Sequence, residues 1–175
     1  MFVTPAPTIK ILESKGGLIT ITGGKWTTYR KMGEDVVDVA VSHAGLPKNK
    51  SVTKDLKIHG YQENTDLSDP LYWYGSDRNI LNEMIRKDPE MGEVLSEKLH
   101  IYKAQVVWAA REEMARTLED CLSRRIRALQ LDAGESIRIA PRAAEIMAQE
   151  LGYNKGWIDR QVQEFTELAS DHLLN

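Results

Sequence analysis

The first apolar positions of the chain alternate with polar ones, as they do in half-buried β-strands. Residues 9–13 and 18–22 form two such runs, and residues 14–17 between them are turn formers with two glycines. This pattern predicts a β-hairpin. Because an isolated hairpin is marginally stable in water, we expect it to be the edge of a larger sheet that lies outside this chain.

The apolar spacing then changes to the helical period of three and four residues, which predicts a helix over residues 27–44. Its apolar stripe consists of Met32, Val36, Val37, Ala40 and Val41. Gly45 follows at the position where glycine commonly ends a helix. Residues 46–58 are polar and contain Pro47, so we expect a linker, with an extended arm over the next domain as the alternative.

From residue 61 onward the pattern is helical, and no other convincing strand is expected. We predict helices over residues 79–87, 91–99, 102–114 and 136–151, another that begins at a capping box at residues 117–120, and a final one capped by Asn154. Residues 71–75 should form a short aromatic turn. Pro141 should kink its helix or mark its true start, and Gly152 should end it.

Particular side chains are expected to face the core of this helical part. The helix over residues 102–114 should turn Val106, Val107, Ala110 and Met114 inward, with Trp108 off that face or at its rim. The helix that begins at residue 117 should bury Leu118, Cys121, Leu122, Ile126 and Leu129, and the final helix Ile158, Val162, Phe165 and Ala169.

The fold class that follows is mainly α. A bundle of five to six helices is preceded by a β-hairpin plus one helix. The expected division of the chain is residues 1–46 for the hairpin and first helix, 47–60 for the linker and 61–175 for the helical domain.

Composition and charge exclude several classes of protein. The chain is 42% hydrophobic and 28% charged, as expected for a soluble globular protein, and its net charge of -3 argues against nucleic-acid binding. No apolar run is long enough to span a bilayer, and no signal peptide is apparent. The single cysteine, Cys121, should be a buried inert thiol, and the four histidines lack metal-ligand spacing, so no metal site is expected.

The strongest candidate for chemistry is the junction between the second strand and the first helix. Gly23 and Gly24 permit a tight turn, after which the helix start offers unpaired N–H groups and the positive end of its dipole. Lys25 adds a positive charge there, and Thr27 and Thr28 add hydroxyl donors. The junction is therefore either one wall of an anion-binding site or a plain strand-to-helix connection.

Two other groups of residues have no assigned role. Arg124, Arg125 and Arg127 lie within about one helical turn. They form either a solvated face or a surface that docks another domain or an anionic partner. The aromatic residues at 72–74 are either a stacking platform or packing at the end of the bundle. No acid–base pair or Ser-His-Asp pattern is visible, so no catalytic residue is predicted.

Two long motifs resemble one family. The run Gly-Gly-Lys-Trp-Thr-Thr-Tyr-Arg-Lys-Met at residues 23–32, followed by 34–38, resembles the segment that closes the flavin domain of FAD-dependent glycerol-3-phosphate dehydrogenases and the related alpha-glycerophosphate oxidases. Residues 111–120 and 122–127 resemble the C-terminal helical domain of that family. The resemblance runs from about Ile9 to the end of the chain.

The resemblance implies that residues 1–46 are the end of an FAD-binding domain. Lys25, Trp26, Thr27 and Thr28 would lie beside the flavin ring, and Arg30 would join them or only anchor the helix start. The parent enzyme would oxidise sn-glycerol 3-phosphate and pass electrons to quinone or oxygen. This enzyme would be cytoplasmic or peripheral at the inner membrane, and it could form a homo-oligomer. No Gly-x-Gly-x-x-Gly pattern is present, so this chain should neither bind FAD tightly without its missing N-terminal flavin domain nor turn over substrate alone.

One position departs from the family pattern. The family usually has an arginine just before the hairpin that helps to hold the substrate phosphate, but residues 5–9 read Pro-Ala-Pro-Thr-Ile. Either the chain's start is not native sequence or the site differs. The alternative function is a free-standing helical module for protein interaction or regulation.

Overall fold

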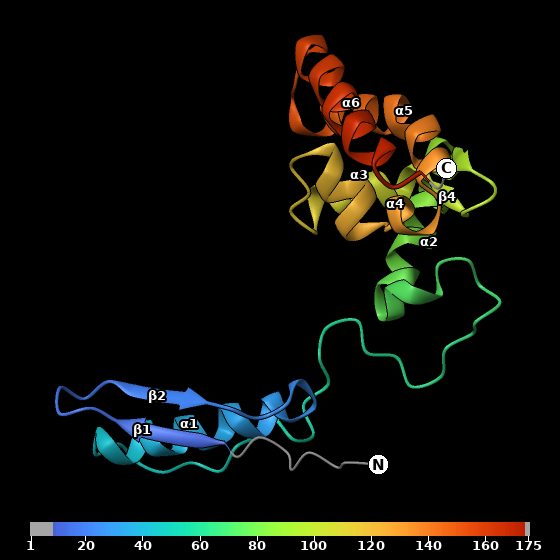
Figure 1. Cartoon of the computed structure of the whole chain (residues 1–175). Coiled ribbons are helices and arrows are strands. Elements are labelled where there is room, and N and C mark those ends of the chain that lie inside the picture. The colour runs from blue at the N-terminus through green and yellow to red at the C-terminus, as the bar shows by residue number, and fades with distance from the viewer. Residues whose placement is uncertain (1–8, 174–175) are drawn as a thin grey trace, which may run out of the picture. The chain divides into compact units, whose positions relative to one another are not determined.

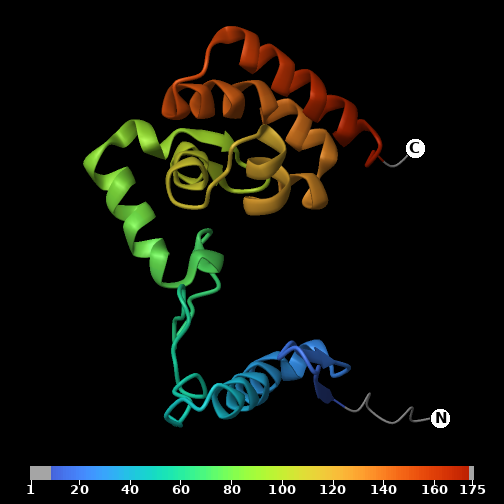
Figure 2. The same cartoon turned by 90° about the vertical axis from the view of Figure 1, so that its left-hand side faces the viewer.

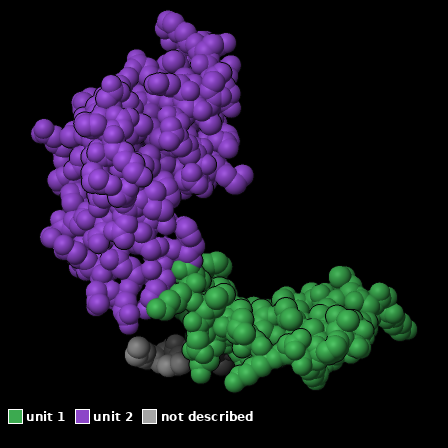
Figure 3. Space-filling model, turned by 180° about the vertical axis from the view of Figure 1, so that it is seen from behind, with its two compact units in different colours: residues 1–58 green, residues 59–175 purple. Residues whose placement is uncertain are grey.

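The computed structural model describes residues 9–173, and its chain divides into two compact units between Ile58 and His59 (Figure 3). Whether the start of the chain is native sequence is a question about residues 1–8, which lie outside the described residues. The predicted division into residues 1–46, 47–60 and 61–175 stays a prediction.

The first unit begins with the predicted hairpin. Strands β1 (Lys10–Glu13) and β2 (Ile19–Thr22) pair antiparallel, with Ile11 opposite Ile21. The backbone N–H of Ser14 donates to the carbonyl oxygen of Leu18 at 2.9 Å. This bond closes the turn and fixes the register of the two strands, so the predicted hairpin is confirmed.

A single helix, α1 (Tyr29–His43), packs along the hairpin (Figure 1). A 3-10 turn, Trp26–Thr28, leads into it, and Gly45 follows its end with φ 63°. The predicted helix is thus confirmed, but its apolar stripe is not fully covered. Val37 is 57% exposed, and none of the described residues of β1, β2 and α1 is buried.

The second unit is helical, which confirms the predicted mainly α fold. Its helices are α2 (Arg78–Lys87), α3 (Lys103–Arg111), α4 (Ala128–Leu131), α5 (Ala133–Leu151) and α6 (Lys155–Ser170). Helices α5 and α6 lie side by side (Figures 1 and 2). None of the helices in the described part of the chain is long and apolar enough to cross a lipid bilayer.

Helix α3 is the centre of this unit, and Figure 2 shows it nearly end-on among the other elements. Every residue from Lys103 to Ala110 is buried. Two sequence predictions were wrong here. Trp108 is buried rather than at the rim, because neighbours surround α3 on all sides. Met114 is 73% exposed, because the helix ends at Arg111 and the chain turns away with φ 58° at Met114.

The predicted helix over residues 91–99 was wrong, and so was the expectation of no further strand. Strands β3 (Val94–Ser96) and β4 (Ile101–Tyr102) form a small antiparallel pair. An isolated helix of nine residues is only marginally stable, whereas the strand pair buries Leu95 and Ile101 against the core. Tertiary packing therefore overrides the helical pattern.

The capping box at residues 117–120 is present, but the helix after it is interrupted. Asp120 accepts hydrogen bonds from the N–H groups of Arg116 and Thr117, and its own N–H donates to the Thr117 hydroxyl at 3.0 Å. A π-helical turn, Asp120–Arg125, follows, and Arg127 adopts φ 64° before α4. The predicted inward residues Leu118, Cys121, Leu122, Ile126 and Leu129 are all buried.

The last two helices have the caps that the sequence indicates. Asp132 caps α5 by accepting from the Glu135 N–H at 2.9 Å, so α5 begins three residues before the predicted start at 136. The helix runs through Pro141 instead of starting there. Gly152 ends it with φ 72°, and Asn154 caps α6 as predicted. Phe165 and Ala169 are buried, while Ile158 and Val162 are half-buried against the core.

Candidate functional site

The junction between β2 and α1 depends on two consecutive glycines. Gly23 and Gly24 both have φ 85°, in the left-handed region that favours glycine. A Cβ at Gly24 would lie 2.5 Å from Met32 Sδ and 3.3 Å from Ile9 Cγ1. The glycines therefore permit both the turn and the close approach of α1 to the hairpin.

Lys25 and Thr28 fix the conformation of the helix start. The Thr28 hydroxyl donates to the Lys25 carbonyl oxygen at 2.9 Å and accepts from the Lys25 N–H at 3.3 Å. The Thr28 N–H donates to the same carbonyl oxygen at 2.9 Å. Because its hydroxyl serves as this cap, Thr28 would contact a ligand less freely than Thr27.

Trp26 and Thr27 are the first two residues of the 3-10 turn that leads into α1. Their backbone N–H groups therefore have no acceptor within the helical segment. They lie at the positive end of the α1 dipole. Among residues 9–173, no carboxylate pairs with the Lys25 side chain. The junction therefore combines two backbone donors with an unneutralised cation.

The neighbouring cations are neutralised by carboxylates of α1. Arg30 Nη1 lies 2.5 Å from Glu34 Oε2 and donates to the Thr53 hydroxyl at 3.1 Å, while Lys31 pairs with Glu34 and Asp35. The hydrogen bonds from Arg30 and Lys31 lower the pKa of Glu34 to about 2. Arg30 thus holds the helix start and the following segment together, and Lys25 remains the cation of the junction.

An exposed aromatic pair stands beside these donors. The rings of Trp26 and Tyr29 stack with centroids 5.5 Å apart and an interplanar angle of 25°, and Trp26 is 87% exposed. Aromatic side chains with an exposed ring can contribute to a contact surface. The aromatic pair, the two N–H groups and the Lys25 side chain thus all belong to residues 25–29.

No cluster of metal-ligating side chains occurs within the part of the chain that the structure describes. Cys121 is buried, as predicted, and burial raises the pKa of its thiol far above the usual range. The thiol is therefore protonated and inert. The junction remains the candidate site in the first unit.

The chain matches the family described as the C-terminal domain of alpha-glycerophosphate oxidase over residues 20–157. It is 29% identical to a mitochondrial glycerol-3-phosphate dehydrogenase of Arabidopsis thaliana, over 90% of this chain and 30% of that protein. It is 32% identical to the mitochondrial glycerol-3-phosphate dehydrogenase of Mus musculus, over 91% of this chain and 24% of that protein.

A bacterial protein, glycerol-3-phosphate dehydrogenase 2 of Mycobacterium bovis, is 29% identical over 91% of this chain and 30% of its own length. The chain thus spans between 22% and 30% of the length of the curated relatives that it matches. The matched region includes both motifs singled out from the sequence, the junction at residues 23–32 and the segment at residues 111–127.

Proposed function

Since the chain belongs to the family of the C-terminal domain of alpha-glycerophosphate oxidase, we propose that it is the C-terminal part of a flavoprotein. The complete protein would oxidise sn-glycerol 3-phosphate to dihydroxyacetone phosphate and pass electrons to quinone or oxygen. The observation that carries this proposal is the junction of β2 and α1, where Lys25 and two helix-start N–H groups lie together in the segment that the family shares.

When bound, FAD would supply the hydride acceptor of this reaction. The residues of this chain that would hold it are Lys25, Trp26, Thr27 and Thr28. Lys25 would place its positive charge, and Trp26 and Thr27 their backbone N–H groups, at the ring edge that becomes negative on reduction. Donors fixed in advance at such an edge stabilise developing charge without reorganisation. Thr28 contributes by holding Lys25 in its extended conformation.

The surface of the first unit supports its role as one part of a larger flavin domain. Leu12, Leu18 and Val37 are exposed, and no described residue of β1, β2 or α1 is buried. A sheet-and-helix unit without a buried residue lacks a core of its own and needs further elements to pack against. The partner that we propose is the flavin domain itself. Because this chain has no Gly-x-Gly-x-x-Gly pattern, we expect it to bind FAD weakly and to be inactive when isolated.

The decisive experiment measures flavin reduction by sn-glycerol 3-phosphate in the complete protein under anaerobic stopped-flow conditions. We expect Lys25→Ala to slow reduction by about tenfold or more, since loss of a single donor to developing charge costs at least that much in other enzymes. Lys31→Ala is the matched control. It removes a cation from the same segment, but one already paired with Glu34 and Asp35, and should change the rate less than about twofold.

Three outcomes would contradict different parts of the proposal. If sn-glycerol 3-phosphate does not reduce the flavin of the unaltered protein, the proposed activity is wrong. If Lys25→Ala reduces at the same rate as Lys31→Ala, the activity stands but the role of Lys25 is wrong. Tight stoichiometric binding of FAD by the isolated chain would contradict the expectation that the rest of the flavin domain is needed.

A further inference from the structure

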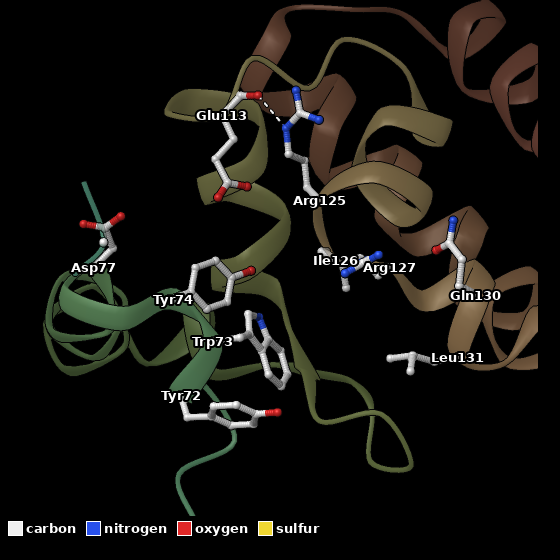
Figure 4. A pocket seen from close by; sticks show the side chains of 11 residues that line it. Tyr72, Trp73, Tyr74, Asp77, Glu113, Arg125, Ile126, Arg127, Gln130 and Leu131 are labelled. Carbon is white, nitrogen blue, oxygen red and sulfur yellow. Dashed lines mark hydrogen bonds between the residues drawn. The ribbon is translucent and has the colours of Figure 1, made fainter. Parts of the chain in front are cut away.

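The second unit contains a cavity of about 660 Å³ that does not involve the junction of β2 and α1. Four segments far apart in the sequence line it: Gly60, Tyr72–Asp77, which precedes α2, Glu113, which follows α3, and residues 125–131 around α4 (Figure 4). Its volume lies within the range of small-molecule sites. The cavity brings together the aromatic residues and the arginines for which the sequence offered no role.

One side of the cavity is aromatic. Tyr72 and Trp73 meet edge to face, with ring centroids 5.4 Å apart and planes at 77°, and Trp73 and Tyr74 are 5.9 Å apart. Tyr72 and Trp73 are 39% and 45% exposed, so their ring faces are not covered by the core. A planar ring could stack on Trp73 and meet Tyr72 at its edge. Stacking of this kind accepts any nucleobase.

The opposite side carries two guanidinium groups without a carboxylate partner among residues 9–173 (Figure 4). Arg125 Nε donates to the carbonyl oxygen of Glu113 at 2.8 Å, which leaves its terminal nitrogens available. Arg127 holds a left-handed backbone conformation that is strained for a residue other than glycine. Arg124, by contrast, pairs with Glu119 and Asp120 and does not line the cavity.

Carboxylates and a buried hydroxyl face the cavity near the aromatic side. Asp77 and Glu113 both line it, and Asp77 Oδ2 already pairs with His59 Nε2 at 2.6 Å. Burial raises the pKa of Glu113, the charge of Asp77 adds to this rise, and Arg125 opposes it. Among the residues that the structure describes, the buried Tyr74 Oη atom has no hydrogen-bond partner. Burial raises the pKa of this phenol, and the nearby Gln105 and Trp73 counteract that only in part. Tyr74 is therefore a neutral, unsatisfied donor.

We propose that this cavity binds a purine nucleoside monophosphate. The base stacks on Trp73, its exocyclic amine lies toward Glu113, and its phosphate lies toward Arg125 and Arg127. The site is separate from the proposed flavin site and does not depend on the proposed function.

The distribution of charge selects this class of ligand over simpler ones. The Glu113 carboxylate points toward the Tyr74 ring, whereas Arg125 and Arg127 come from the segment on the other side of the aromatic residues (Figure 4). A ligand with donors at one end and a phosphate at the other complements both. An apolar molecule would leave the guanidinium groups desolvated and unpaired. A small phosphate ester without a ring would leave Trp73 uncovered.

The first test is isothermal titration calorimetry of the full chain with four probes: adenosine 5′-monophosphate, adenosine, inorganic phosphate and sn-glycerol 3-phosphate. Adenosine 5′-monophosphate should bind with one-to-one stoichiometry and at least about tenfold more tightly than each of the others, because only it has both the ring and the phosphate. The proposal is overturned if it shows no saturable binding at millimolar concentration. It is equally overturned if sn-glycerol 3-phosphate or inorganic phosphate binds as tightly.

The second test locates the site with a pair of matched variants. Arg127→Gln should weaken binding of adenosine 5′-monophosphate by about tenfold or more, and Trp73→Leu should do so as well. Arg124→Gln removes the same charge three residues away and should leave the affinity within about twofold. Equal effects of Arg127→Gln and Arg124→Gln would overturn the proposed site. Circular dichroism checks that each variant is folded, and if Arg127→Gln is not, the four-probe comparison on the unaltered chain decides.

Discussion

At the scale of single residues, Gly75 has the most restricted surroundings in the second unit. Its φ of 56° and ψ of -127° belong to a region open essentially only to glycine. A Cβ at this position would lie 1.8 Å from the carbonyl oxygen of Gly60, which accepts a hydrogen bond from the Ser76 N–H at 3.2 Å. Any side chain would therefore push Gly60 away and open the aromatic turn.

We expect Gly75→Ala to lower the free energy of unfolding by about 2 kcal/mol or more, from backbone strain and steric overlap together. Urea unfolding of the full chain, followed by circular dichroism, measures this. Gly134→Ala is the matched control, because its Cβ would meet only the Asp132 Oδ1 atom at 3.5 Å and Leu173 Cδ2 at 3.9 Å. It should be neutral or slightly stabilising. If the two variants were equally stable, the inference that only glycine fits at residue 75 would be wrong.

A second single-residue prediction concerns Gln161, which is buried in α6. Its Oε1 atom accepts a hydrogen bond from the Leu118 N–H at 2.8 Å, and this bond joins α6 to the segment after α3. Gln161→Ala would leave that buried N–H unpaired, so we expect a loss of about 1–3 kcal/mol in the free energy of unfolding. Thermal and urea unfolding of the variant would measure it.

The control for Gln161 is Gln163→Ala on the same helix. The Gln163 side chain is exposed and bonds only to Glu167, one turn away, so its loss should cost less than about 0.5 kcal/mol. If both substitutions cost the same, the buried hydrogen bond contributes nothing beyond helix propensity.

At the scale of elements, the first turn of α5 is held to the β3–β4 segment by charged hydrogen bonds. The Ser96 hydroxyl donates to Glu135 Oε1 at 2.5 Å, and Arg138 donates to both oxygens of Glu135 and to the carbonyl oxygen of Leu95. Lys98 pairs with the capping residue Asp132. These bonds attach the β3–β4 segment to the first turn of α5, and the short strands depend on this contact for their stability.

The attachment predicts a dependence of stability on pH. The hydrogen bonds from Arg138 and Ser96 lower the pKa of Glu135 to about 2, below the unfolded value of about 4.3. A carboxylate whose pKa is lower in the folded state stabilises the fold above its unfolded pKa, and this contribution is lost as pH falls toward the folded pKa. The difference in unfolding free energy between the wild type and Glu135→Gln should therefore be largest above about pH 5 and shrink between about pH 5 and pH 2.

Urea unfolding at several pH values measures this difference. Glu145→Gln serves as the control, since Glu145 lies on the same helix but is mostly exposed and pairs only with Arg142. Its effect should be small at every pH. A difference for Glu135→Gln that stays constant from pH 6 to pH 2 would show that the hydrogen bonds do not depend on the charge of Glu135.

The same elements show which local signals could be predicted from sequence. Asn154 and Gly152 delimit helices correctly, because caps act within a few residues of the chain. The pair β3–β4 was missed because its strands are two and three residues long. Their stability comes from α5 and the core, which a sequence window does not contain.

At the scale of the whole molecule, the segment between α1 and the second unit is the expected site of cleavage. Residues 47–50 form no helix or strand, and Lys48, Lys50 and Lys54 are exposed. Limited digestion with trypsin should cut here first and release a resistant fragment that contains α2 to α6, because exposed irregular segments are cleaved preferentially. Mass spectrometry of the early products would identify the cut.

The competing sites provide an internal control. Lys155 and Arg160 are also largely exposed, but they lie within the regular helix α6 and should be cut later. Early cleavage in α6, before any cut between Lys48 and Lys54, would contradict the view that residues 59–175 form a stable unit of their own.

The sequence by itself determined whatever depends on neighbouring residues. The hairpin, the helix boundaries at Gly152 and Asn154, and the turn before Trp26 are each formed by residues that are close together in the sequence, so turn chemistry and periodicity were sufficient to predict them. The end of α3 and the start of α5 were each predicted three residues away from where they lie. The proposed contact of residues 25–28 with a flavin stays a prediction.

The tertiary structure alone decided what depends on distant segments. Trp108 is buried because it packs with Leu71, Tyr74 and Leu81, which lie in the aromatic turn and α2. The strand pair β3–β4 is stabilised because Leu95 and Ile101 pack into the main core. The cavity joins Tyr72–Asp77 to Arg125 and Arg127 across some fifty residues. No local pattern encodes such proximity, because it arises only when the helices pack around one core.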